Sequence, residues 1–207
     1  MSGGWTTIKG AATASFVEKR SEFIGNISPV TTEEEAIAFV SKIKKQYTDA
    51  KHNVYAYLLR DNSITRFSDD GEPHGTAGLP VLDVLRKEGV TNVAVVVTRY
   101  FGGILLGTGG LVRAYSQAAK MALDAAGKST VEELTAFTLR VSYSDLQKVE
   151  PILENQTMLK IGTVYENDVR LSFAIRAAEY EPLAKALTER TNGRAILAVD
   201  GTRFDCI

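Results

Sequence analysis

The residues best suited to chemistry lie in two glycine-rich stretches. The first, Thr98–Lys120 (TRYFGGILLGTGGLVRAYSQAAK), holds five glycines and two arginines. Gly109 and Gly110 directly precede a predicted helix, whose free N–H groups and dipole favour an anion. Arg99 and Arg113 flank these glycines, and arginine makes bidentate contacts with phosphate or carboxylate. The pattern predicts a site for an anion or an RNA backbone.

The same loop has a purely structural interpretation. A P-loop has lysine after its second glycine, but Thr108 follows Gly107 here. A dinucleotide-binding fingerprint has a third glycine where this chain has Val112. The apolar run Ile104–Leu106 favours a hinge whose glycines allow tight turning and close packing, or a surface that docks another protein. Both interpretations remain open.

The second stretch is Ser68–Pro80, SDDGEPHGTAGLP. Asp69, Asp70, Glu72 and His74 bring three carboxylates and an imidazole together, which indicates a metal site or an acid–base group. The alternative is a polar turn, because Asp-Gly and Glu-Pro are strong turn formers. The ligand spacing of an EF-hand is absent, so calcium is not expected.

No complete catalytic constellation appears. Ser116 lies outside any G-x-S-x-G motif, and the single cysteine, Cys206, has no histidine partner and is expected in a mobile tail. The net charge of −1 gives no global basic field to attract nucleic acid or a membrane. Without a signal peptide or a long apolar stretch, we expect a cytoplasmic protein with no membrane partner and no cofactor.

Hydrophobic periodicity predicts the elements that position these stretches. In the first half we expect strands within 16–27, 52–60 and 63–67 and a strand at 91–98 that is covered on both faces. Helices are expected at 32–47, begun by a capping box, and at 79–89. A hairpin turn is expected at Asp61–Asn62. The helix that follows the glycine loop is expected to bury Leu111, Tyr115, Ala118, Ala122 and Ala126 and to expose Arg113, Gln117, Lys120 and Asp124.

The second half has its own pattern. Gly127–Glu133 interrupts the periodicity, so we place a boundary there and expect domains at 1–130 and 131–207. The order β-α-β-β-α-β then predicts a ferredoxin-like arrangement. Its first helix is expected to begin at a capping box of Ser144 and Gln147. The chain as a whole is predicted to be an α+β protein with two domains.

Four ordered blocks resemble the bacterial YigZ branch of the IMPACT family: KRSEFIG, DAKHNVYAYLL, SDDGEPHGTAGLPVLDVL and VAVVVTRYFGGILLGTGGLVRAYS. Arg99–Gly103, followed by Gly107, matches the signature of that family. The resemblance implies an N-terminal domain of the ribosomal protein S5 domain 2 type. It implies a C-terminal domain like domain V of elongation factor G. The related eukaryotic domain regulates translation through a kinase pathway that bacteria lack.

The resemblance also implies a set of site residues, and it places the two glycine-rich stretches side by side. The motif residues carried over by position are Asp70, Gly71, Glu72, Pro73, Gly75, Thr76, Gly78, Arg99, Tyr100, Phe101, Gly102, Gly103, Gly107, Gly110 and Arg113. These motif residues without Pro73, Gly75 and Gly78, and with Gly109, Lys120 and His74 added, are the candidate binding residues. His74 lies where the family pattern suggests a small residue. Neither catalytic nor metal-binding residues are predicted.

Two functions from different classes follow. The first is a non-enzymatic regulator or binding module of the translation machinery. It would contact RNA, the ribosome or a ribosome-associated protein through a basic, glycine-lined surface at Arg99, Arg113 and Lys120. The alternative is an enzyme that binds a small molecule or nucleotide with the same loop and the acidic turn. No oligomeric state is predicted.

Overall fold

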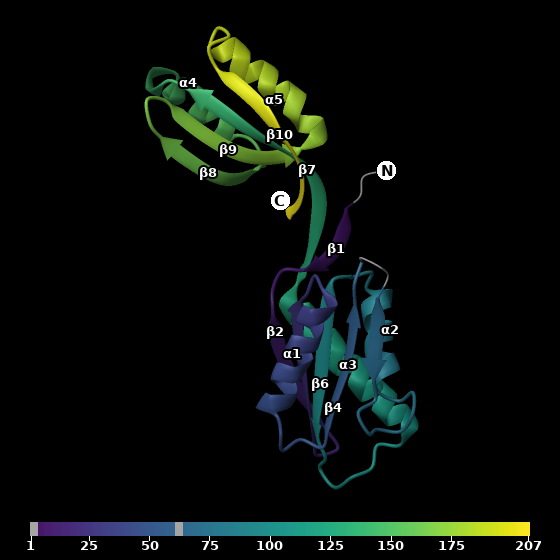
Figure 1. Ribbon diagram of the computed structural model, residues 1–207. Helices are drawn as coiled ribbons and strands as arrows, with labels where there is room; N and C mark the ends of the chain where they lie inside the picture. Colours follow the sequence, from purple (N-terminus) through teal and green to yellow (C-terminus); the bar gives the residue numbers. More distant parts are fainter. Residues whose placement is uncertain (1–3, 61–63) are drawn as a thin grey trace. The chain divides into compact units, whose positions relative to one another are not determined.

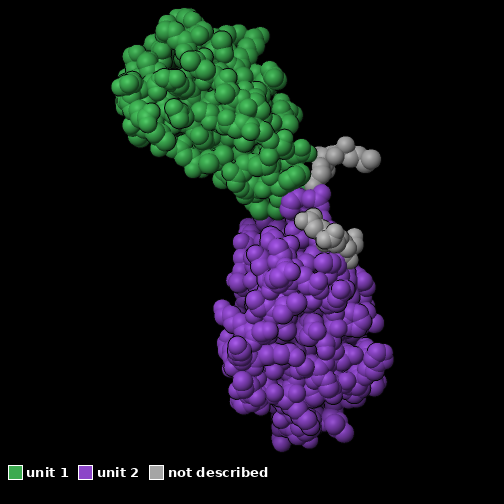
Figure 2. Space-filling view, viewed as in Figure 1, with its two compact units in different colours: residues 1–4, 130–207 green, residues 5–129 purple. Residues whose placement is uncertain are grey.

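The computed structural model describes residues 4–60 and 64–207, and the chain divides into two compact units (Figure 2). Residues 5–129 form the N-terminal unit, and residues 130–207 with Gly4 form the C-terminal unit. The α+β class with two domains is confirmed. The limits 1–130 and 131–207 remain our proposal for the domains.

An antiparallel sheet is the centre of the N-terminal unit (Figure 1). Its strand order is β2-β3-β6-β4-β5, and it is preceded in the chain by the short strand β1. The bounds are β1 Trp5–Ile8, β2 Ala12–Glu18, β3 Ser21–Pro29, β4 His52–Leu58, β5 Thr65–Ser68 and β6 Val93–Tyr100. The predicted hairpin turn at Asp61–Asn62 lies outside the described residues.

Helices cover both faces of this sheet. Helix α1 (Glu33–Gln46) packs on one face, and α2 (Gly78–Lys87) and α3 (Thr108–Ala126) pack on the other. Strand β6 therefore buries Val95 and Val97 under α2 and α3 and Val96 under α1. This confirms the prediction that a near-continuous β-branched run is a strand covered on both sides.

The ends and faces of the helices largely follow their sequence. Thr32 caps α1 by accepting a hydrogen bond from the Glu35 N–H, as predicted, although the Glu35 carboxylate accepts from Thr31. The predicted buried face of α3 is confirmed, because all five of its expected core residues are buried. These are Leu111, Tyr115, Ala118, Ala122 and Ala126.

The C-terminal unit has the predicted β-α-β-β-α-β order and the sheet order β10-β7-β9-β8, which is the ferredoxin-like arrangement. The alternating side chains of β7 and β9 pack Phe137, Leu139 and Phe173 against the helices. The bounds are β7 Lys128–Val141, α4 Tyr143–Glu154, β8 Leu159–Tyr165, β9 Val169–Arg176, α5 Ala177–Arg190 and β10 Ile196–Cys206.

Three sequence expectations about this half are wrong. Residues 128–133 are not a break between elements, because they begin β7, and residues 131–133 pair with the end of β10. For the same reason Cys206 is not in a mobile tail, since it pairs with Val131, although its side chain is exposed. Helix α4 is capped by Ser142 rather than Ser144, because the Ser142 hydroxyl accepts from the Asp145 N–H.

Asp145 provides a prediction on acid stability. Its carboxylate accepts two hydrogen bonds from Arg194 and one from Lys148, which hold the pKa of Asp145 well below its usual value. A lowered pKa in the folded state means that the stabilisation is complete above about pH 5 and is lost as the pH falls below the unfolded pKa of about 4. Asp145→Asn should therefore lower the free energy of unfolding at pH 7. It should also reduce the amount by which that free energy falls between about pH 5 and pH 2. Urea unfolding at a series of pH values measures both effects; an unchanged acid slope contradicts the assignment.

Candidate functional site

A buried polar cluster of Glu72, Arg99 and Tyr115 joins the two glycine-rich stretches. The Glu72 Oε1 atom accepts hydrogen bonds from Arg99 Nη1 at 2.6 Å and from the Tyr115 hydroxyl at 2.8 Å. Arg99 is only 5% exposed, and its guanidinium lies over the rings of Phe23 and Phe101. Burial, together with the Glu72 charge, raises the pKa of Tyr115, so its hydroxyl remains a donor. The cluster fixes the acidic turn against β6 and α3.

The acidic turn itself is tied to its surroundings. Burial opposes ionisation of Asp69, but the N–H groups of Gly75, Ala77 and Gly78 donate to its carboxylate and hold its pKa below the usual value. Asp69 therefore caps the start of α2 from outside the helix. His74 lies beside it, 3.7 Å from the Asp69 carboxylate, with a fully exposed ring.

Asp70 holds the turn against β4. Its carboxylate accepts from Lys44 Nζ at 2.6 Å and from the Asn53 N–H at 2.7 Å. His52 Nδ1 lies 2.8 Å from the Asp70 carbonyl oxygen, and because a carbonyl only accepts, Nδ1 carries a proton. Asp70 and Gly71 both have positive φ, as an Asp-Gly turn requires. The polar-turn interpretation of this stretch is thus confirmed at Asp69 and Asp70.

Two further predicted residues, Thr76 and Tyr100, use their hydroxyl groups in contacts within the protein. Thr76 is buried, and its hydroxyl donates to the Pro73 carbonyl. Tyr100 donates its hydroxyl to the Asp49 carboxylate at 2.7 Å. Among the described residues, no group of three or more His, Cys, Asp or Glu side chains is placed to hold a metal ion.

Glycines shape the loop between β6 and α3, which lies at one end of the N-terminal unit (Figure 1). A Cβ atom on Gly102 would lie 2.0 Å from the main-chain carbonyl of Arg20, so only glycine allows the loop to pack on the β2–β3 turn. Gly103 and Gly107 have positive φ, and Gly107 precedes α3 without a side-chain cap. Gly109 and Gly110 lie in the first turn of α3.

The loop and the β2–β3 turn together present what we call the loop surface: the exposed side chains of Lys19, Arg20, Phe101, Ile104, Leu105 and Arg113. Leu105 is 82% exposed and Phe101 is 50% exposed. A cavity of about 280 Å³ beside them is lined by Lys19, Leu106 and Arg113, with Glu18 as the acidic member. The surface is therefore apolar at its centre and mainly basic along one side.

The structure corrects the predicted basic surface. Arg99 does not contribute, because its guanidinium is buried against Glu72. Lys120 is half-buried and its ammonium contacts Glu88 and Asp124, so it has its own counterions. Arg113 is exposed, and its Nε donates to the Gly109 carbonyl oxygen. The expected pair of guanidinium groups beside the loop is thus reduced to one.

Sequence reasoning missed four residues that belong to this region. Tyr115 was expected only in the core, and its hydroxyl contact with Glu72 was not foreseen. His52 lies near the same carboxylate, with 3.9 Å between His52 Nε2 and Glu72 Oε1. Lys19 and Arg20 form the β2–β3 turn with positive φ, and only the contact with Gly102 reveals that this turn joins the loop.

None of the helices in the described part of the chain combines the length and the apolar composition that a membrane-spanning helix needs. Among solved structures, the chain resembles one titled "Crystal structure of an hypothetical protein", at 35% identity and a TM-score of 0.60, over 95% of this chain and 97% of that one. That similarity extends over both units.

Family comparisons cover both units. Residues 19–123 match the Impact N-terminal domain, and residues 139–194 match a domain of unknown function, DUF1949. IMPACT family member YvyE of Bacillus subtilis is 38% identical, over 91% of this chain and 88% of that protein. IMPACT family member YigZ of Escherichia coli is 37% identical, over 92% of this chain and 96% of that protein. Protein IMPACT of Oryctolagus cuniculus is 37% identical, over 44% of this chain and 30% of that protein. The chain therefore belongs to the IMPACT family, as its motifs indicated.

Proposed function

We propose that this protein is a non-enzymatic regulator of the translation machinery that binds the ribosome through the loop surface of its N-terminal unit. The observation that carries the proposal is the exposed, glycine-shaped apolar loop, with Leu105 at 82% exposure, above the buried polar cluster. Exposed apolar side chains rimmed by polar groups are typical of protein interaction sites. Membership of the IMPACT family supports a regulatory role.

The charges in this region also favour binding over acid–base chemistry. Each carboxylate of the acidic turn already accepts hydrogen bonds within the protein. Asp69 accepts from backbone N–H groups, and Asp70 accepts from a lysine. Glu72 accepts from Arg99 and Tyr115. A general acid or base needs a group that is free to exchange a proton with substrate. The acidic turn therefore supports the position of the loop, and the exposed residues above it are left to make contact with a partner.

We expect Leu105→Ser to weaken ribosome binding by about tenfold, because a central apolar side chain loses its buried contact in the complex. Co-sedimentation of the full chain with bacterial ribosomes measures the dissociation constant. The matched control is Ile37→Ser, which changes a 53% exposed apolar residue on α1. Equal binding by the wild type and both variants, or equal losses in both, contradicts the proposal.

The salt dependence gives a separate prediction. Only Lys19, Arg20 and Arg113 provide exposed cations to the loop surface, so phosphate contacts should give a slope of log K against log salt no steeper than about −2 to −3. Arg113→Ala should make that slope shallower by about one. Lys185→Ala, which changes an exposed cation in the C-terminal unit, should leave it unchanged. If Arg113→Ala leaves the slope unchanged, Arg113 is not part of the proposed interface.

A further inference from the structure

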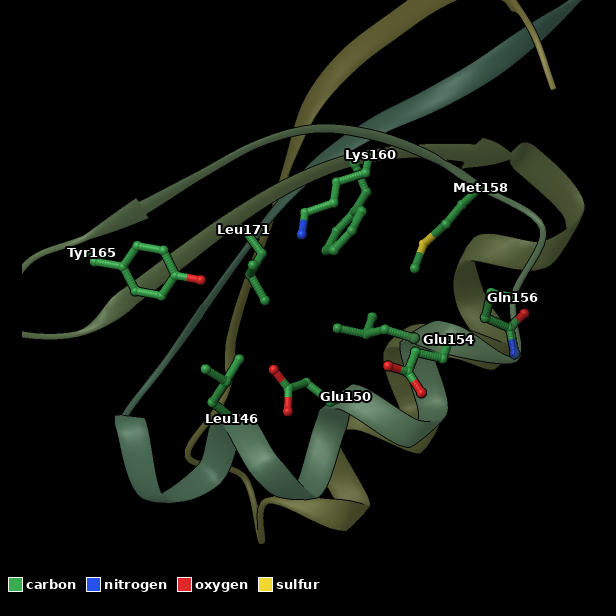
Figure 3. Close-up of a pocket in the computed structure, with 10 residues that line it drawn as sticks. Leu146, Glu150, Glu154, Gln156, Met158, Lys160, Tyr165 and Leu171 are labelled. Atoms are coloured by element: carbon green, nitrogen blue, oxygen red, sulfur yellow. The ribbon is translucent and has the colours of Figure 1, made fainter.

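The C-terminal unit contains a cavity of about 300 Å³ between α4 and the β8–β9 edge of the sheet (Figure 3). Glu150 and Glu154 line it from α4, and Lys160 and Tyr165 line it from β8. Its apolar wall includes Leu171 of β9 and Met158. In Figure 3 the two carboxylates, the ammonium and the phenol hydroxyl all point into the same space.

A β-bulge explains why two residues of β8 meet there. Side chains separated by five positions on a regular strand point to opposite faces of the sheet. Here the register shifts between Lys160 and Gly162. Lys160 is then paired with Phe173 and Tyr165 with Val169, so both share the helix-facing side with these buried residues.

The charges in the cavity lack counterions among the residues that the structure describes. In the described ranges, no hydrogen bond or ion pair joins Glu150, Glu154 or Lys160 to another side chain. Glu150 and Glu154 are four positions apart on α4, a spacing at which like charges repel. Several other charges of this unit do have partners, as Asp145 has in Lys148 and Arg194. Three unpaired charges directed into one partly apolar cavity indicate a ligand that carries charges of its own.

We propose that this cavity binds a free α-amino acid with an apolar side chain. The ammonium group of the ligand lies between Glu150 and Glu154, and its carboxylate contacts the Lys160 ammonium and the Tyr165 hydroxyl. The side chain of the ligand packs against Leu171 and Phe173. A simple anion would be repelled by two carboxylates, and a purely apolar molecule would leave all three charges desolvated without partners. The proposal is independent of ribosome binding, because it concerns the other unit alone.

Isothermal titration calorimetry of the full chain with L-leucine, L-methionine and L-phenylalanine tests the proposal. We expect saturable binding at millimolar concentrations for at least one of the three. N-acetyl-leucine removes the ligand's positive charge and leucinamide removes its negative charge, so each should bind at least about tenfold more weakly than leucine. Failure of all three amino acids to bind, or equal binding of leucine and N-acetyl-leucine, overturns the proposal.

Substitutions locate the binding in the cavity. The double variant Glu150→Gln with Glu154→Gln should weaken amino-acid binding at least about tenfold, and Lys160→Met should weaken it severalfold. All three side chains are exposed, so the thermal unfolding midpoint should change little. Glu189→Gln, on the exposed face of α5, should bind like the wild type. Unchanged affinity in the double variant places the ligand elsewhere and overturns the assignment.

Discussion

Glu72→Ala is expected to destabilise the N-terminal unit by about 3–5 kcal/mol, the usual cost of removing one partner of a buried ion pair. The substitution leaves the Arg99 guanidinium buried without its carboxylate and leaves the Tyr115 hydroxyl without its acceptor. Arg99 already has one unsatisfied donor, because its Nε is buried without a hydrogen-bond partner among the described residues. The penalty therefore comes from an uncompensated charge more than from lost packing.

Hydrogen exchange of the β3 and β6 amides measures this loss in the N-terminal unit itself, even if the two units unfold separately. The paired variant Glu72→Leu with Arg99→Met removes both charges and should recover most of the lost stability. Glu34→Ala, an exposed carboxylate on α1, should change stability by less than about 0.5 kcal/mol. If Glu72→Ala lowers stability no more than Glu34→Ala does, the cluster does not hold the acidic turn.

Gly102→Ala should cost about 1–3 kcal/mol and displace the loop. A Cβ atom at this position would lie 2.0 Å from the main-chain carbonyl carbon and oxygen of Arg20. Main-chain atoms of a strand turn cannot rotate away as a flexible side chain can, so the loop and the turn must separate. We therefore expect weaker ribosome binding together with the lost stability.

Gly109→Ala is the matched control for this substitution. Nothing lies within 4 Å of a Cβ atom there, and Gly109 is in the first turn of α3. Alanine should be neutral or stabilise the helix by up to about 1 kcal/mol. Urea unfolding and ribosome co-sedimentation compare the two variants. Equal stability and equal binding would mean that close packing at Gly102 does not shape the loop surface.

The arrangement of elements could be predicted from local patterns. The β-branched run at 91–98 predicted β6, and the spacing of Leu111, Tyr115 and Ala118 predicted the buried face of α3. The βαββαβ order followed from alternating strands and capped helices. Element ends were less predictable, because Ser142 and Ser144 are both possible caps and only the main-chain geometry of α4 selects Ser142.

The buried polar cluster was only half visible in the sequence. A period of two along β6 places Arg99 on the same face as Val95 and Val97, which the same pattern predicts to be buried. That signal was available and argues against a free guanidinium. Its partner Glu72 is 27 positions away in a turn, and only the tertiary fold brings that carboxylate to Arg99.

The residues of the loop surface could also be predicted from the sequence only in part. Leu105 is exposed in a loop whose Gly103 and Gly107 both have positive φ, and composition alone does not show this exposure. Lys19 and Arg20 are distant in sequence from the loop and join it through the close approach of Gly102. The identity of the exposed residues therefore depended on the packing of two segments that no local pattern relates.

Hydrogen–deuterium exchange of the full chain, with and without bacterial ribosomes, tests most directly whether the loop surface is the docking site. We predict slower exchange at residues 101–113 and 19–22 in the presence of ribosomes, and unchanged exchange along α1. Protection confined to α1 or to the C-terminal unit, or no protection anywhere, would contradict the account.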